Sequence, residues 1–270
     1  MRVKFKDLDK KWDNICYFDD FISLNKGILF YTSKRRSKMK KYLLALILCF
    51  VLVVCAGCNK KNNSNETPCN HNFVNGICEL CQEENPKELE LIVAKEVYDN
   101  LMLAYLACPV ISSGVYAAWY FAVYDATDCA ATSSVSEFSK AIGVKSSVVE
   151  PLVNKKALEL GFDTHAIGQW ATLRRENAAV DVVLMIYEQT GMFTETEKYL
   201  DNAKINLKKL TGEYQYDTHL SDLQSLYSVV LSYYKSSVYP SGTLNGFRTA
   251  VSNYEQEVKT YKNKLSIYYE

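Results

Sequence analysis

The chain has 270 residues, of which 48% are apolar, 23% charged and 13% aromatic, and this composition excludes a disordered, collagen-like or disulfide-dense protein. The formal net charge is zero, but the basic and acidic residues are unevenly distributed along the chain. The first 57 residues hold 12 of the 31 basic and 5 of the 31 acidic residues, so the remainder, with 19 and 26, carries −7. A net-acidic body argues against nucleic-acid binding, because basic side chains supply most of the affinity for phosphate.

Residues 39–57 have the three parts of a secretory signal peptide. Met39-Lys40-Lys41 gives a positive start, residues 42–55 form an uncharged run of 14, and Ala56-Gly57 supplies small residues before Cys58. The run is shorter than the roughly 20 apolar residues that a spanning helix needs. A permanent anchor helix or a buried core helix is the alternative interpretation.

The segment Val54-Cys55-Ala56-Gly57-Cys58 resembles the lipobox of bacterial lipoproteins, although Cys55 stands where that family usually has leucine. The resemblance implies that Cys58 carries a diacylglycerol thioether and becomes the mature amino terminus. We therefore expect a protein anchored to the lipid bilayer through Cys58, on the extracytoplasmic face of the cell membrane. Two acyl chains, at about 0.8 kcal/mol per buried CH₂, suffice for a stable anchor.

Residues 1–38 do not fit this scheme, because a long polar leader before a signal peptide is unusual. We interpret them as a spurious or disordered extension that results from a start assigned too early. A genuine cytoplasmic extension is the alternative, and it would need packing partners for Trp12 and Cys16.

A small cysteine module is expected at residues 69–85, after a linker at residues 58–68 that is rich in Asn, Lys and Ser. Asn75-Gly76 predicts a two-residue hairpin turn, which would bring together four candidate metal ligands, Cys69, His71, Cys78 and Cys81. Three thiolates and an imidazole suit Zn²⁺, and four protein ligands indicate a closed structural site. The segment resembles short zinc-ribbon-like modules, from which Gln82 departs because glycine is common there. A Cys78–Cys81 or Cys69–Cys78 disulfide is the alternative.

Cys108 and Cys129 are expected to be two buried thiols. A straight helix between them would separate them by on the order of 30 Å, whereas a disulfide needs Cα atoms within about 7 Å.

The body at residues 86–270 is predicted to be an all-α, antiparallel multi-helix bundle. Asn85-Pro86 with Glu88 predicts the start of a first helix, and Cys108-Pro109 predicts its end. Residues 115–124 are apolar all round and predict a central helix. All prolines after residue 85 are assigned to boundaries between helices.

Later helices are predicted from caps and from periodicity. Capping boxes are assigned at Ser134/Glu137 and Thr194/Glu197, residues 164–190 are read as one long helix, and glycines 143, 161, 191 and 212 are expected to end helices. Apolar residues spaced 3 and 4 apart over 200–210, 220–234 and 244–268 predict three helices that pack as antiparallel neighbours.

The sequence has no Gly-x-Ser-x-Gly elbow, no His-Glu-x-x-His, no phosphate-binding glycine loop and no Gly-x-Gly-x-x-Gly, and no catalytic residue is assigned. A proton shuttle between His165 or His219 and Glu159 or Glu176 is conceivable, but solvated histidines at helix starts are the favoured interpretation. Arg174-Arg175-Glu176-Asn177 could bind a carboxylate, but it is favoured as a charged helical surface.

Aromatic residues offer a second kind of candidate site. Residues 116, 119, 120, 121 and 124 could line a sugar or peptide cleft, but most of them are expected in the core. Four tyrosines of the C-terminal helices are expected to be exposed for contacts: Tyr233, Tyr234, Tyr239 and Tyr269.

The sequence therefore predicts a lipid-anchored helical module that binds a protein, peptide or glycan partner. A hydrolase of cell-envelope glycan or peptide is the alternative.

Overall fold

The computed structural model describes residues 73–74, 77–79, 85–212 and 218–270. The chain divides into two units, residues 1–70 and 71–270, and all described residues belong to the second. The predicted extension, signal peptide, lipidation site and linker lie outside the described residues.

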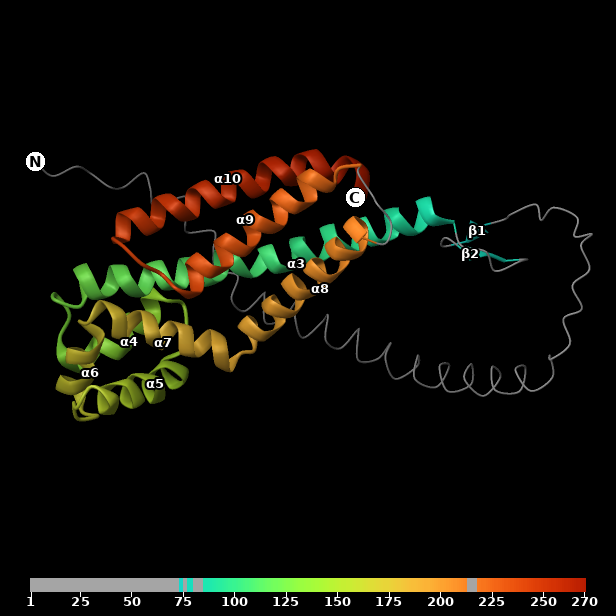
Figure 1. The fold of residues 1–270 in the computed structure, drawn as a ribbon. Helices are drawn as coiled ribbons and strands as arrows, with labels where there is room; N and C mark the ends of the chain where they lie inside the picture. The colour runs from blue at the N-terminus through green and yellow to red at the C-terminus, as the bar shows by residue number, and fades with distance from the viewer. Residues whose placement is uncertain (1–72, 75–76, 80–84, 213–217) are drawn as a thin grey trace, which may run out of the picture. The chain divides into compact units, whose positions relative to one another are not determined.

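The described residues form helices, apart from two short antiparallel strands (Figure 1). This confirms the all-α prediction for the body. The strands are β1 (Phe73–Val74) and β2 (Ile77–Cys78), paired Phe73 to Cys78 and Val74 to Ile77. The α-helices are α3 (Pro86–Tyr120), α4 (Ser134–Ala141), α5 (Ser146–Glu159), α6 (Ala166–Leu173), α7 (Glu176–Gln189), α8 (Met192–Gly212), α9 (Leu220–Val238) and α10 (Leu244–Tyr269). Helix α3 continues into a π-helix, η1 (Phe121–Asp125), and a 3₁₀ turn, η2 (Ala131–Ser133), precedes α4.

Helix α3 starts at Pro86 as predicted, but the predicted end at Cys108-Pro109 is wrong because the helix continues through Pro109. Proline has no backbone N–H, so the carbonyl of Tyr105 loses its usual donor. Side chains reinforce the next turn: the Ser112 hydroxyl donates to the Pro109 carbonyl at 3.2 Å, and the Tyr187 hydroxyl donates to the Val110 carbonyl at 3.0 Å. Packing on both sides of the proline offsets a cost of about 3 kcal/mol. Pro151 likewise lies inside α5 rather than at a boundary.

The single helix predicted for residues 164–190 is also wrong, because the chain breaks between α6 and α7. Arg175 has extended backbone angles, φ −91° and ψ 114°, and precedes the first residue of α7. The guanidinium of Arg174 lies 4.5 Å from the ring centre of Trp170, and that of Arg175 lies 4.8 Å from Phe162. The contact between Arg175 and Phe162 joins the break to the loop before α6, and the apolar periodicity does not contain it.

The two predicted capping boxes do not form. Helix α4 has Ser133 at its N-cap without a side-chain cap bond, and Glu137 pairs instead with Lys140 at 2.9 Å. Helix α8 begins at Met192, so Thr194 lies inside it. The glycine predictions hold better, since Gly143, Gly161 and Gly191 follow helix ends with positive φ, and Gly212 is the last residue of α8.

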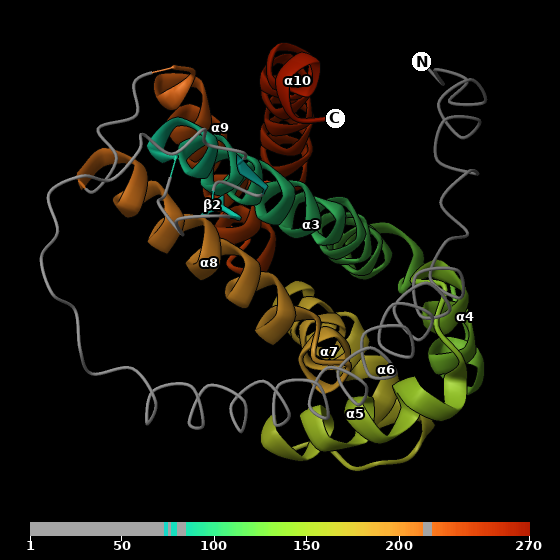
Figure 2. The same ribbon diagram turned by 90° about the vertical axis from the view of Figure 1, so that its right-hand side faces the viewer.

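The long helices α3, α8, α9 and α10 form a bundle in which α3 contacts each of the other three (Figures 1 and 2). Helix α9 runs antiparallel to α8 and to α10, as predicted, and contacts both. The central position belongs to α3, which also packs against α7. The shorter helices α4 to α7 gather around the C-terminal end of α3.

Three of the four tyrosines expected at the surface are core residues. Tyr233, Tyr234 and Tyr269 are buried, and only Tyr239, at 74% exposure, confirms the prediction. The hydroxyl of Tyr233 lies 3.1 Å from that of Ser112 and bonds Glu255, and that of Tyr234 bonds Glu197. Because tyrosine can bury its ring while its hydroxyl finds a partner, tyrosine content is a poor sign of exposure.

Helix α3 together with η1 is long and apolar enough to cross a membrane, by length and composition alone. Half of its most apolar window is buried by the other helices of the bundle. The buried half of the window is typical of a core helix in a bundle. Packing within the bundle does not account for the apolar character of the other half.

Candidate functional site

The predicted metal ligands are described only at Cys78. Its side chain is fully buried in β2, whereas its neighbour Ile77 is 41% exposed. Cys69, His71 and Cys81 lie outside the described residues. The donor set suits Zn²⁺, and a buried Cys78 thiol is compatible with metal binding. Because the other three ligands are not described, the zinc site stays a prediction.

The residues suggested for a proton shuttle have separate partners. Glu159 pairs with Lys156 at 3.3 Å, and the same lysine bonds Asp181 at 2.6 Å. Glu176 accepts a hydrogen bond from the indole N–H of Trp119 at 2.7 Å. The side chain of His165 is 88% exposed beside Asp163. Each of these contacts can be explained as a contact that stabilises the fold.

His219 occupies an unusual backbone position. It precedes α9 with φ 58°, the one non-glycine residue with positive φ among those described. Its ring lies 3.8 Å from the ring of Tyr268, centre to centre, near the end of α10. We interpret this stack as a clamp between the start of α9 and the end of α10.

The candidate aromatic cleft is divided between core and surface. Trp119 and Phe121 are buried, as expected, whereas Tyr120 and Tyr124 are 42% and 52% exposed. Tyr116, half-buried, lies 6.1 Å from Tyr120, and Tyr120 lies 4.7 Å from Tyr124, between ring centres. The three tyrosines thus form a ladder on one side of α3 and η1 rather than a cleft.

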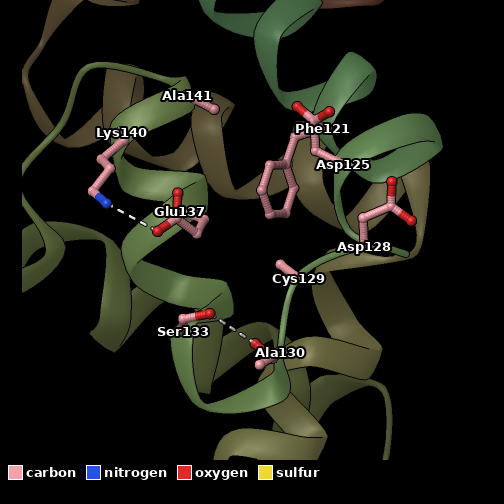
Figure 3. Close-up of a pocket in the computed structure, with 9 residues that line it drawn as sticks. All are labelled: Phe121, Asp125, Asp128, Cys129, Ala130, Ser133, Glu137, Lys140 and Ala141. Atoms are coloured by element: carbon pink, nitrogen blue, oxygen red, sulfur yellow. Dashed lines mark hydrogen bonds and ion pairs between the residues drawn. The ribbon is translucent and has the colours of Figure 1, made fainter.

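A shallow pocket of about 660 Å³ lies beside the end of α3. In Figure 3, α4 contributes Glu137 and Lys140, which pair with each other, and the other side of the pocket includes Phe121, Asp125 and Cys129. The pocket is acidic, since Asp128 also lines it and Lys140 is already paired with Glu137.

The pocket holds one thiol, that of Cys129, which is protonated at neutral pH. Burial raises the pKa of the Cys129 thiol, and the carboxylates of Glu137, Asp125 and Asp128 raise it further. Since the thiolate is the reactive form, this cysteine is a weak nucleophile. Burial also raises the pKa of Asp125, with a smaller contribution from Asp128. Within the described ranges, no three His, Cys, Asp or Glu side chains converge closely enough to hold a metal ion.

The feature most suggestive of binding is an uncharged surface along α3. No charged residue occurs from residue 100 to 124. The side chains that turn away from the bundle in this stretch form the α3 stripe, which includes four exposed residues, Leu103 (39%), Leu106 (52%), Tyr120 (42%) and Tyr124 (52%). Its other members, Val110, Ser113 and Ala117, are half-buried.

The α3 stripe runs along one side of the central helix. It extends about 32 Å at 1.5 Å per residue. The rest of the helix packs against α7, α8, α9 and α10. Its spacing, 103, 106, 110, 113, 117, 120 and 124, was available in the sequence, but a helix end placed at Pro109 divides the stripe in two. The continuity of α3 through that proline is what reveals it.

Comparison with known protein families, with curated proteins and with solved structures gives no match for this chain.

Proposed function

We propose that the protein is a lipoprotein, anchored through Cys58 to the extracytoplasmic face of the cell membrane, whose helical body is a protein-interaction module. The anchor is supported by the sequence Val54-Cys55-Ala56-Gly57-Cys58, which follows an uncharged run of 14 residues. A zinc site at residues 69–85 is part of the proposal and serves a structural role near the anchor.

The observation that carries the interaction role is the α3 stripe. Large exposed side chains such as Leu106 and Tyr124, each 52% exposed, lie in line on one helix without an intervening charge. Contiguous apolar patches on soluble proteins commonly mark interaction surfaces. A face of this shape suits a partner helix better than a small ligand, because it is long and has no enclosed cavity.

The alternative of a hydrolase gains no support from the residues that suggested it. Glu159, Glu176 and His165 each contact a different partner, Lys156, Trp119 and Asp163 respectively. The acidic pocket offers a thiol with a raised pKa, which is the opposite of what nucleophilic catalysis needs.

The anchor is tested with the full chain expressed in a bacterium that processes lipoproteins. We expect the wild-type chain to sediment with membranes and to enter the detergent-rich phase on temperature-induced phase separation. Cys58→Ser should move the chain to the aqueous phase, because the acyl chains are lost. Cys55→Ser is the matched control and should behave as wild type. Equal partitioning of all three chains would refute the anchor.

The interaction role is tested by chemical cross-linking in the same cells. The wild-type chain should give a cross-linked species of higher mass. Leu106→Glu places a charge on the exposed face, near one end of the α3 stripe, and should reduce this species at least tenfold. Ile267→Glu changes a residue of α10 that is 80% exposed and should leave it unchanged. A species insensitive to Leu106→Glu would show that the α3 stripe is not the binding surface.

A further inference from the structure

We propose that the α3 stripe is the interface of a symmetric homodimer, in which two copies of α3 pack antiparallel about a two-fold axis near Ser113. This inference rests on the proposed interaction role and names the partner, a second copy of this chain.

The spacing of the stripe indicates that the partner element is a helix. Its seven positions are separated by 3, 4, 3, 4, 3 and 4 residues, which is the heptad seam of two helices packed side by side. The four exposed residues are Leu103, Leu106, Tyr120 and Tyr124, and the inner members are smaller and half-buried.

The stripe has leucines at one end, small residues at its centre and tyrosines at the other end. Two copies packed antiparallel therefore place large side chains opposite smaller ones. Antiparallel pairing centred on Ser113 sets Leu103 opposite Tyr124 and Leu106 opposite Tyr120. Val110 then lies opposite Ala117, and Ser113 lies near Ser113 of the other copy. Each tyrosine therefore meets a smaller leucine, and the small central residues allow the two helices to approach where they cross.

Parallel pairing fits less well. It would set both tyrosine positions against tyrosines at one end of the seam and both leucine positions against leucines at the other. The two ends would then require different separations between the helix axes. A two-fold antiparallel arrangement gives both ends the same pairs, as an isologous interface requires.

The area of the stripe is that of a small dimer interface. The four exposed large side chains leave on the order of 400 Å² of surface per copy, or about 800 Å² for the pair. The half-buried members bring the total toward the lower limit of about 1,200 Å² for specific stable interfaces.

The charge around the stripe favours a second copy over a lipid surface. The stripe has no lysine or arginine, and acidic residues lie at its ends, Asp99 before it and Asp125 after it, whereas adsorption to anionic lipid needs basic residues. Antiparallel pairing brings Asp99 of one copy toward Asp128 of the other at the solvated rim. Lys95, which pairs with Asp99 at 3.2 Å, offsets part of this repulsion, and we expect salt to strengthen the dimer.

The test is site-directed disulfide formation in the full chain, in membranes from expressing cells. On mild oxidation, Ser113→Cys should form a disulfide-linked dimer at least tenfold more than Ser252→Cys, the control at an exposed position of α10. The wild-type chain gives the background from native cysteines. Adding Leu106→Glu to Ser113→Cys should abolish the product, whereas adding Ile267→Glu should not.

A mixed experiment tests the orientation. Leu103→Cys and Tyr124→Cys, carried on two differently tagged chains in one cell, should cross-link to each other and not to themselves. Self-linkage of each variant alone would indicate parallel pairing and overturn the proposed geometry.

Other occupants of the stripe would also be recognised. If Ser113→Cys links to a different polypeptide and not to itself, the interaction role stands and the homodimer is refuted. If the bilayer alone shields this cysteine from a water-soluble maleimide, the stripe faces lipid and both proposals for it fail. Loss of membrane partitioning in Cys58→Ser is read separately, so failure of the anchor is not confused with failure of the dimer.

Discussion

The hydroxyl of Tyr187 lies in the space that a side chain on Gly114 would occupy. A Cβ built on Gly114 would overlap the tyrosine oxygen and come within 2.9 Å of its ring carbon Cζ. That hydroxyl donates to the carbonyl of Val110 at 3.0 Å, and Tyr187 is 4% exposed. The absence of a side chain at Gly114 therefore lets α7 reach the backbone of α3 one turn after Pro109, which supports the helix where the proline weakens it.

The first prediction is that Gly114→Ala destabilises the protein. Alanine favours a helix by about 1 kcal/mol over glycine, but displacing a buried tyrosine costs about 2 to 3 kcal/mol. We expect a net loss of about 1 to 2 kcal/mol in the free energy of unfolding, measured by urea denaturation followed by circular dichroism. Gly212→Ala, where nothing lies within 4 Å, should be neutral or stabilising. The account is contradicted if both substitutions stabilise.

A second prediction concerns the bond between Trp119 and Glu176. The Trp119 indole is 8% exposed and donates to Glu176 at 2.7 Å. Glu176→Ala leaves the N–H without its acceptor and should cost about 1 to 3 kcal/mol. Glu176→Gln retains an oxygen acceptor and should recover at least half of the loss. Thermal unfolding of the three proteins decides this, and an unchanged stability in Glu176→Ala would argue that the bond is incidental.

Cysteine reactivity provides a third prediction. Cys108 is buried, its thiol donates to the Ala104 carbonyl at 3.5 Å, and burial raises its pKa well above the ordinary thiol range. In the folded protein Cys108 should resist alkylation at pH 8, and Cys129 should react slowly because its pKa is also raised. Both should react completely in denaturant, as shown by mass spectrometry of peptides. A Cys108–Cys129 disulfide would contradict the structure, in which neither forms one.

Asp125 gives a prediction with a defined pH dependence. Its folded-state pKa is raised above 3.8, mainly by burial, so the folded state holds the proton more tightly than the unfolded state does. Stability must then fall as pH rises through this window. Asp125→Asn should raise the melting temperature at pH 7 by no more than about 2 °C, since the carboxylate is only partly buried and solvent screens it.

The benefit of Asp125→Asn should disappear as the pH falls toward about 2.5, where the wild-type carboxyl is protonated in both states. Glu150→Gln, on the exposed face of α5, serves as the control and should show no comparable pattern. A benefit that grows on acidification would contradict the assignment.

The fifth prediction concerns metal. We expect one Zn²⁺ per purified chain by elemental analysis, because Cys69, His71, Cys78 and Cys81 supply a complete tetrahedral donor set. Cys81→Ser should remove most of the zinc, whereas Cys129→Ser should not. Zinc removal should leave the helicity of residues 86–270 unchanged, since none of the four proposed ligands belongs to helices α3 to α10. A metal-free chain with a Cys78–Cys81 disulfide would support the alternative.

Periodicity predicted the body well where one face of a helix is buried by its neighbours. Leu200, Ala203, Leu207 and Leu210 are all buried along α8, as their spacing indicates. It failed at Pro109 and at Arg174-Arg175. At the first, contacts from Tyr187 and Ser112 support a helix that a local rule would end. At the second, Arg175 has an extended backbone and stacks on Phe162, where the periodicity predicts that the helix continues.

Burial of aromatic residues was predicted least well, because it depends on tertiary partners. Tyr269 is buried against Tyr98, whose hydroxyl bonds Glu270 at 2.8 Å, while the adjacent Tyr268 stays 57% exposed. Because burial depends on tertiary partners, the α3 stripe could not be identified from the sequence either. The heptad spacing of the α3 stripe is visible in the sequence, but an unburied heptad looks like a buried one until the neighbouring helices are placed.

Mass spectrometry of the amino-terminal peptide from the membrane-extracted native chain tests the central claim most directly. The account predicts a peptide that begins at Cys58 and carries a diacylglycerol group on its sulfur. A chain that retains residues 39–57, with an unmodified Cys58 thiol, would contradict it.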